Sequence, residues 1–184
     1  MRIVLFGKNI FRIYQHHIME IRYETLCKYK SVCKFKLQEI DTDSIGSEIE
    51  LVGSTISLRN LERVVKNNKS FVKGFIFKNS AGCKAGTIWV MFRGGNDIEY
   101  KIRNIEAYIF NVYVNQAYRG NGFAGEMIYQ LMNILHLKGI ENAYLAVSIK
   151  NSSAIKAYEK VGFVNVYDRK FARVLKINIP YHIL

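Results

Sequence analysis

The sequence predicts a mixed α/β layer fold, in which an antiparallel set of strands precedes a strand–helix–strand–helix–strand tail. Two short apolar runs, residues 107–114 and 143–147, have the pattern of buried strands, and an amphipathic segment of helical spacing follows each of them. The 184 residues are enough for one domain with a substantial core. A content of 49% apolar and 13% aromatic residues argues against a disordered chain.

The first half of the chain carries the weaker patterns. Apolar residues at helical spacing predict a helix over residues 11–26, and alternation predicts a strand over 33–40. Ser57 is a candidate N-cap for a short amphipathic helix over 58–65. The remaining expected elements of this half are strands over 71–77 and 87–92, joined by a turn at 79–82.

The second half carries the stronger patterns. Residues 107–114 are apolar on both faces except at Asn111, as expected of a central strand. Apolar residues spaced three and four apart predict a helix over 122–138, and Gly139 ends it. The remaining expected elements are a buried strand over 143–147, a helix over 151–161, and two final strands over 163–168 and 170–177.

The chain is strongly basic, with 27 Lys and Arg against 15 Asp and Glu and a formal net charge of +12. Residues 1–38 hold eight Lys or Arg and two Glu, which gives +6. A basic surface attracts anions of many kinds, from nucleic acid to a nucleotide cofactor. No nucleic-acid motif is present and the aromatic residues lie within apolar runs, so a basic surface around an anionic cofactor is the simpler interpretation.

Cysteine content and hydropathy indicate the compartment. Cys27, Cys33 and Cys83 are odd in number and lack paired C-x-x-C spacing, so neither a disulfide framework nor a metal site is expected. No apolar run approaches the roughly 20 residues that span a bilayer, and the apolar start of residues 1–8 is too short for a signal peptide. A cytoplasmic location without a membrane span is therefore expected.

A glycine-rich turn connects the 107–114 strand to the 122–138 helix. Positions 120, 122, 124 and 125 are Gly, Gly, Ala and Gly, and such small side chains leave backbone N–H groups open. The first four N–H groups of a helix lack intrahelical partners and lie at the positive end of its dipole. A helix beginning near Gly122 therefore predicts a site for a phosphate or pyrophosphate, with the guanidinium of Arg119 at its rim.

Two other interpretations of this turn must be weighed. Residues 120–125 also match the dinucleotide-binding pattern G-x-G-x-x-G, although Glu141 follows Gly139 at a helix end rather than closing a second strand. A plain turn that starts a helix is the other alternative. A second segment, residues 151–163, weakens both, because Asn151 is a candidate N-cap and Gly162 a candidate C-cap of an amphipathic helix.

Together the two segments resemble the GNAT superfamily of acyl-CoA-dependent N-acetyltransferases. Its signature is Val-x-x-x-x-Arg-Gly-x-Gly-x-(Gly/Ala) and then, after a spacer, Asn-x-x-Ala-x-x-x-Tyr-x-x-x-Gly-Phe. The matching residues are Val114, Arg119, Gly120, Gly122 and Ala124, then Asn151, Ala154, Tyr158, Gly162 and Phe163. The resemblance extends over residues 70–178 and is strongest over 107–163. Gln116 departs from it where the family often has proline, which concerns loop stiffness more than chemistry.

The resemblance implies a central, mostly antiparallel sheet that splays open where the pantetheine arm of the cofactor enters, flanked by helices. It implies one domain over residues 1–184, with a divergent N-terminal part (1–69) and a cofactor-binding core (70–178). Acetyl-CoA is the implied co-substrate, and no metal is implied. Self-association into a homodimer is left open.

The resemblance also implies the cofactor contacts, most of which are backbone groups. The amides of residues 119–124 would take the pyrophosphate, and backbone groups of residues 112–114 would pair with pantetheine. Asn151 would bond cofactor amides, although capping of its helix explains it equally well. The implied cofactor-binding residues are Val112, Tyr113, Val114, Arg119, Gly120, Asn121, Gly122, Phe123, Ala124 and Asn151.

Two catalytic residues follow from the same resemblance. Tyr158 would protonate the departing thiolate, the alternative being that its ring simply packs on the apolar face of the helix. Relatives often carry a carboxylate base on the central strand, but that position falls near Tyr108, so Glu106 is the candidate. A solvated glutamate at the strand end is the alternative for Glu106. The four histidines lie outside any motif and receive no role.

The acceptor amine is the least specified part of the reaction. The basic composition favours a small molecule that carries phosphate or carboxylate, such as a nucleotide-linked amino sugar. Peptide or protein amines stay open as acceptors. The alternatives from other classes are a non-catalytic acyl-CoA-binding protein and a nucleic-acid-binding module.

Overall fold

A computed structural model of the chain describes residues 3–6, 9–28, 34–41, 45–53, 56–95, 101–174 and 177–180. The strands are β1 (Ile3–Phe6), β2 (Asn9–Arg22), β3 (Lys36–Glu39), β4 (Val72–Lys78), β5 (Lys84–Met91), β6 (Glu106–Val114), β7 (Asn142–Ser148), β8 (Val164–Val174) and β9 (Ile177–Pro180). The helices are α1 (Ile45–Val52), α2 (Leu58–Asn67), α3 (Phe123–His136) and α4 (Ser152–Val161), with short 3₁₀ helices η1 (Tyr23–Lys28) and η3 (Gln116–Tyr118).

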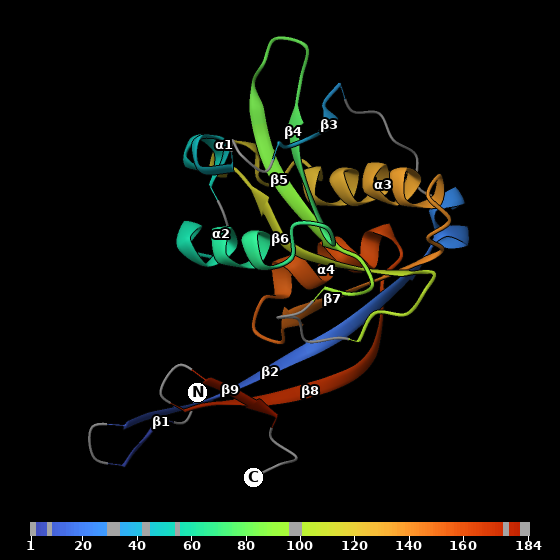
Figure 1. Ribbon diagram of the computed structural model, residues 1–184. Coiled ribbons are helices and arrows are strands. Elements are labelled where there is room, and N and C mark those ends of the chain that lie inside the picture. The colour runs from blue at the N-terminus through green and yellow to red at the C-terminus, as the bar shows by residue number, and fades with distance from the viewer. Residues whose placement is uncertain are drawn as a thin grey trace.

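The described strands form one sheet in the order β3-β4-β5-β6-β7-β2-β8-β9, with β1 paired to β2 (Figure 1). The β6–β7 pair is parallel, and the other strand pairs in the described part of the chain are antiparallel. The predicted mixed α/β fold with a mostly antiparallel sheet is therefore confirmed.

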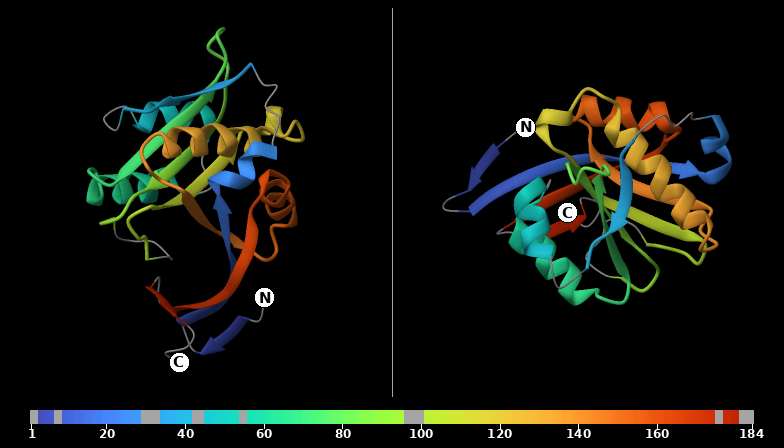
Figure 2. Two further views of the ribbon diagram at one scale, coloured as in Figure 1. Left: turned by 90° about the vertical axis from the view of Figure 1, so that its right-hand side faces the viewer. Right: turned by 90° about the horizontal axis from the view of Figure 1, so that it is seen from above.

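Helices cover both faces of the sheet (Figure 2). On one face α3 and α4 bury Met127, Leu131 and Tyr158 in what we call the first core cluster. On the other face α1 and α2 bury Ile49 and Leu61, together with residues of β5, in the second core cluster. Alternate residues of each central strand enter opposite clusters, as the period of two requires.

The prediction of a helix over residues 11–26 is wrong. This segment forms β2, which lies between β7 and β8 and continues into η1. Ile18 enters the second core cluster while Met19 and Ile21 enter the first, which is the alternation of a strand that is buried on both faces. Spacing alone suggested a helix because a strand with two apolar faces also places apolar residues three apart.

Other boundaries also differ from the predictions. The two strands expected over 163–168 and 170–177 are one continuous strand, β8, because its backbone pairs with β2 from Val164 to Val174. β9 follows it, and α1 was not expected. The α2 prediction is confirmed, with the Ser57 hydroxyl accepting the Asn60 N–H at 3.4 Å. No helix in the described residues has both the length and the apolar character needed to cross a membrane.

Candidate functional site

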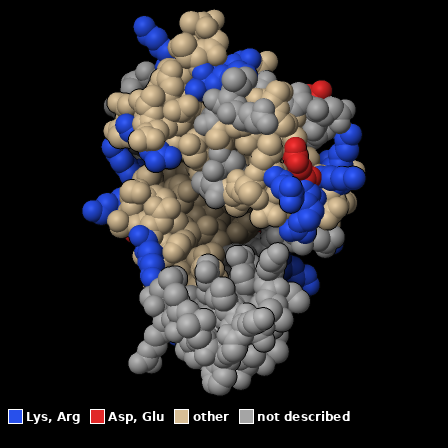
Figure 3. Space-filling model, turned by 90° about the vertical axis from the view of Figure 1, so that its left-hand side faces the viewer, with Lys and Arg blue, Asp and Glu red and all other residues tan. Residues whose placement is uncertain are grey.

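The parallel strands β6 and β7 are paired only at their first residues. Glu106 to Tyr108 pair with Asn142 to Tyr144, and beyond this point the two strands diverge. β6 stays paired with β5 as far as Val114 on its other side. From Ile109 onward the edge of β6 that faces β7 therefore has no strand partner among the described residues. Figure 3 shows the surface hollowed on the side toward which the two strands run.

A β-bulge at Asn111 accompanies this divergence. Tyr113 lies opposite Thr87 and Phe110 opposite Trp89, so β6 has one residue more than β5 over this interval. Asn111 has φ +50°, and among the described residues no other non-glycine residue has a positive φ. A bulge bends a strand and increases its local twist, and the pairing of β6 with β7 ends just before it. The sequence analysis noted Asn111 only as a polar exception in an apolar strand.

The positive φ of Asn111 predicts that glycine is tolerated better than alanine at this position, which is the reverse of the usual order in strands. In the middle of a strand, glycine usually makes the folded protein less stable than alanine does, by roughly 0.5–1 kcal/mol. At a left-handed position alanine carries a cost of roughly 1–2 kcal/mol that glycine avoids. We therefore expect Asn111→Gly to be more stable than Asn111→Ala in urea unfolding. The usual order, with alanine the more stable variant, would show that the bulge does not constrain this residue.

The glycine-rich turn leads into α3 as predicted. Gly120 has φ +84° and Gly122, the N-cap of α3, has φ +74°, so both adopt the left-handed conformation that favours glycine. The Glu126 N–H donates to the Gly122 carbonyl at 3.1 Å, and no side chain caps this helix end. A Cβ atom added at either glycine would meet nothing within 4 Å. The two glycines therefore adjoin free space, and no side chain occupies the positive end of α3.

The side chains of Arg119 and Asn121 shape this turn. Arg119 Nε donates to the Val114 carbonyl at 3.0 Å, and its guanidinium carbon lies 5.6 Å from the centre of the Tyr113 ring. Asn121 Nδ2 donates to the carbonyls of Tyr118 and Arg119 at 3.2 and 3.3 Å. The exposed guanidinium thus lies over the end of β6, beside the turn, and the Asn121 amide holds the turn closed.

The other predicted cofactor residues are divided between the two faces. Val112 and Val114 pack against the first core cluster and Tyr113 against the second. At the start of α3, the Phe123 ring packs against the Phe35 ring, with the two ring centres 4.9 Å apart. Ala124 is half-buried on the first turn of the helix.

Asn151 is the N-cap of α4. Its Oδ1 accepts the Ala154 N–H at 3.2 Å and the Ser153 hydroxyl at 3.1 Å. The predicted capping role is therefore present in the structure. The amide nitrogen of Asn151 is left for other contacts, because both of these bonds use its oxygen.

Tyr158 lies on α4 in the first core cluster, with its ring centre 5.8 Å from that of Phe163. The residue is 8% exposed, and burial raises the pKa of Tyr158 to about 12. Its phenol therefore stays protonated throughout the neutral range. The packing that was the alternative for Tyr158 is therefore observed, while its role as a proton donor stays a prediction.

Glu106 begins β6 at the end where β6 and β7 are still paired. It is 4% exposed, and its Oε2 accepts the Arg103 N–H at 2.9 Å. The alternative of a solvated glutamate at a strand end is therefore wrong. The structure does not bring Glu106 next to residues 112–114, which lie at the other end of the same strand.

Histidines that lack a sequence motif form contacts of their own. His17 Nδ1 lies 2.6 Å from Asp168 Oδ1 across the β2–β8 pair, and Gln15 and Asn165 also donate to the Asp168 carboxylate at 3.1 Å. The hydrogen bond with His17, then that from Asn165, lowers the pKa of Asp168. No cluster of metal-ligating side chains occurs among the residues that the structure describes.

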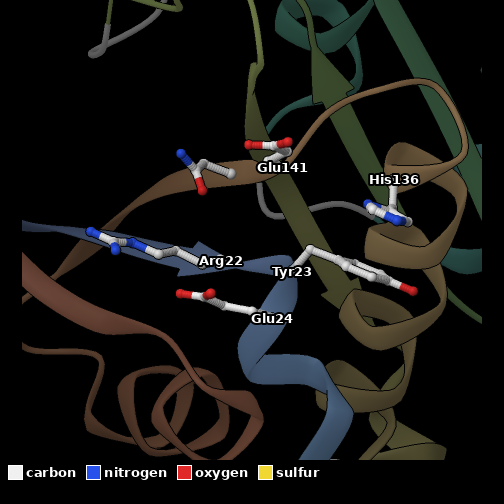
Figure 4. A pocket seen from close by; sticks show the side chains of 6 residues that line it. Arg22, Tyr23, Glu24, His136 and Glu141 are labelled. Carbon is white, nitrogen blue, oxygen red and sulfur yellow. The ribbon is translucent and has the colours of Figure 1, made fainter.

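A cavity of about 450 Å³ lies at the far end of α3. It is lined by Arg22, Tyr23, Glu24, His136, Glu141 and Asn142 (Figure 4). The Tyr23 and His136 rings stack in parallel, with centroids 3.6 Å apart. None of the residues predicted for the cofactor or for catalysis lines this cavity.

Comparisons with known proteins agree with this geometry. The model of the acetyltransferase (GNAT) family matches residues 50–163. A [ribosomal protein bS18]-alanine N-acetyltransferase from Haemophilus ducreyi is 37% identical over 65 residues, which are 35% of this chain and 45% of that protein. The match thus spans less than half of the relative's length.

Solved structures share the fold at low identity. A GNAT-family acetyltransferase from Colwellia psychrerythraea has a TM-score of 0.59 and 15% identity over 89% of this chain and 55% of its own. A predicted acetyltransferase from Clostridium acetobutylicum, solved with acetyl-CoA, has a TM-score of 0.53 and 19% identity over 72% of this chain and 91% of its own. Since the family model matches more than half of the residues and the fold agrees, the chain belongs to the acetyltransferase (GNAT) family.

Proposed function

We propose that this protein transfers an acetyl group from acetyl-CoA to a primary amine. The observation that carries the proposal is the continuity of two binding surfaces. The unpaired edge of β6 is followed, after η3 and the glycine-rich turn, by the uncapped N-terminus of α3. The strand edge suits an extended arm that contains amides, because it offers main-chain donors and acceptors. The helix end suits the pyrophosphate to which that arm is joined.

The remaining groups suit the chemistry of acetyl transfer. The thioester carbonyl must be polarised and the departing thiolate protonated. In this proposal a backbone N–H of the β6 edge polarises the carbonyl, and the Tyr158 hydroxyl supplies the proton. Burial raises the pKa of Tyr158 to about 12, and the same apolar surroundings raise the proton affinity of a thiolate. The pKa values of the phenol and of the thiol therefore move in the same direction.

The acceptor has two candidate classes. A small amine that carries phosphate or carboxylate, such as an amino sugar, agrees with the net charge of +12. A peptide or protein amine is the other class. It is favoured by the 37% identity over 65 residues to a protein whose name gives an alanine of ribosomal protein bS18 as its acceptor. An alanyl peptide amide and an aminohexose phosphate, each supplied with acetyl-CoA, would separate the two classes by thiol release.

Two further parts of the proposal concern the whole chain. We propose that residues 1–184 act as one domain, since β2 lies between β7 and β8 of the same sheet. We also propose a cytoplasmic location, which agrees with Cys83 being a free, exposed thiol. Fractionation with an antibody against the chain would test the location.

Two matched glycines test the cofactor site. Gly122 and Gly139 lie at opposite ends of α3 with φ +74° and +77°, and a Cβ atom at either would meet nothing within 4 Å. Alanine at either position should therefore cost a similar amount, roughly 1–2 kcal/mol of strain. We expect Gly122→Ala, but not Gly139→Ala, to lose most of the rise in thermal midpoint that acetyl-CoA produces.

Ligand-induced stabilisation gives the scale of this test. A ligand that binds only the native state stabilises it by about 2.7 kcal/mol at a hundredfold excess over Kd. Pantetheine, which lacks the pyrophosphate, should stabilise the wild type much less than acetyl-CoA does. Equal shifts with both compounds, or equal losses in the two alanine variants, would contradict the pyrophosphate site at α3.

A further inference from the structure

Three strands carry a row of polar side chains across the point where the sheet opens. The register places Glu20 of β2 opposite Tyr144 of β7, and Tyr144 beside Tyr108 of β6. Partners directly opposite in neighbouring strands share one face of a sheet. Tyr108 and Tyr144 are the last paired residues of β6 and β7 before these strands diverge. The row therefore crosses the closed end of the opening.

This row lies on the face opposite Tyr158. Tyr108 and Tyr144 belong to the second core cluster, while Tyr158 and α4 belong to the first. Beside Glu20 on β8, Val164 is 59% exposed, and Tyr167, which pairs with Ile18, is 41% exposed. The second face is therefore open to solvent over β8. A molecule that approaches from there reaches the opening from the side opposite the predicted acid.

Glu20 has the chemistry of a proton acceptor at this position. Its Oε1 accepts the Tyr144 hydroxyl at 2.9 Å, and its side chain is 13% exposed. Glu20 also forms an ion pair with Arg22, whose Nε lies 3.6 Å from Glu20 Oε1 and whose side chain is 60% exposed. Across the sheet, Glu20 pairs with Tyr144 on one side, beyond which lies Tyr108, and with the apolar Val164 on the other.

Glu106, the base expected from the sequence, is less suitably placed. It pairs with Asn142, two residues before the Tyr108–Tyr144 pair and so farther from the opening. Its carboxylate already accepts the Arg103 N–H, and the residue is 4% exposed. Of these two carboxylates on the second face, Glu20 is therefore both nearer the opening and more accessible.

We propose that Glu20 receives the ammonium group of the acceptor and takes its proton. This inference rests on the proposed acetyl transfer. The carboxylate removes one proton from the ammonium, and the nitrogen lone pair then attacks the thioester carbon. A C–N bond forms, the C–S bond breaks, the nitrogen gives up its second proton to water to leave the neutral amide, and the thiolate takes the proton of Tyr158. Glu20 releases its proton to water, and the Tyr158 phenolate is reprotonated from water.

The test compares Glu20→Gln with the wild type across pH, using whichever amine probe gives the higher wild-type rate. Glutamine still accepts the Tyr144 hydroxyl, so the fold and the acetyl-CoA-induced thermal shift should be unchanged. At pH 7 we expect kcat/KM to fall by about 10²-fold or more. The deficit should shrink as pH rises past the pKa of the amine itself, about 8 for an α-amino group, because the nitrogen is then already neutral.

Two variants complete the experiment. Glu24→Gln, an exposed carboxylate four residues along the chain, should give the wild-type profile. For Glu106→Gln, any deficit in kcat/KM should not shrink as the pH rises. A Glu20→Gln deficit that is constant with pH, or recovery in Glu106→Gln instead, would overturn the assignment while leaving acetyl transfer intact. Wild-type protein that releases no thiol with either probe would overturn the proposed function and this inference together.

Discussion

Tyr158→Phe should lower kcat for acetyl transfer by roughly 10²- to 10⁴-fold, the usual contribution of a positioned general acid. Phenylalanine keeps the ring that packs 5.8 Å from Phe163 and removes only the hydroxyl. The acetyl-CoA-induced thermal shift should therefore stay close to the wild-type value. Single-turnover measurement with the responsive amine reports the chemical step directly.

Alkaline unfolding provides a control for the position of this hydroxyl. The pKa of Tyr158 is raised from 10.0 to about 12 by burial, so the unfolded chain ionises there before the folded chain does. The stability that this group contributes is complete below pH 10 and is lost as pH rises toward 12. Tyr158→Phe should lack that part of the loss. Near-normal single-turnover rates in the variant would remove Tyr158 from the mechanism and leave it a packing residue.

Gly86→Ala should destabilise the protein more than any other single added methyl group near the site. A Cβ atom there would lie 2.4 Å from the Tyr113 carbonyl oxygen and 2.9 Å from the Met127 sulfur. Because the nearer atom belongs to the backbone, β6 itself must move. Overpacking of this kind typically costs about 1–3 kcal/mol. Since Gly86 is paired with Val114, we expect acetyl-CoA binding to weaken as well.

Gly46→Ala is the matched control for that experiment. A Cβ atom at Gly46, in α1, meets its nearest neighbour, Glu62 Oε1, at an ordinary 3.7 Å. Alanine in a helix is favoured over glycine by up to about 1 kcal/mol, so this variant should be as stable as the wild type or more so. Urea unfolding of both variants tests the pair. A Gly86→Ala protein as stable as Gly46→Ala would contradict the close approach of β5 and β6.

The sequence predicted the parts of the site whose signals are local. The turn at Gly120 and Gly122, the start of α3 and the Asn151 cap of α4 depend on residues within a few positions of each other. Backbone conformation and hydrogen bonding to nearby N–H groups determine such features. Periodic apolar residues likewise predicted the helices that became α3 and α4.

Features that depend on distant pairing could not be predicted in this way. Glu20 is hydrogen-bonded to Tyr144, which is 124 residues away in the sequence, and His17 to Asp168, which is 151 residues away. The bulge at Asn111 exists only relative to the register of β5. The helix predicted over 11–26 failed for the same reason, because the neighbours that make it a strand lie at the other end of the chain.

The position of β2 has a consequence for synthesis on the ribosome. β2 is made well before its neighbours β7 and β8, which span residues 142–148 and 164–174. Contacts this distant in sequence slow folding, because a long loop must close before the contacts can stabilise it. Apart from its short pairing with β1, this strand has edges that stay open to other chains until β7 and β8 have been translated. Nascent-chain binding by chaperones should therefore persist until β8 has emerged.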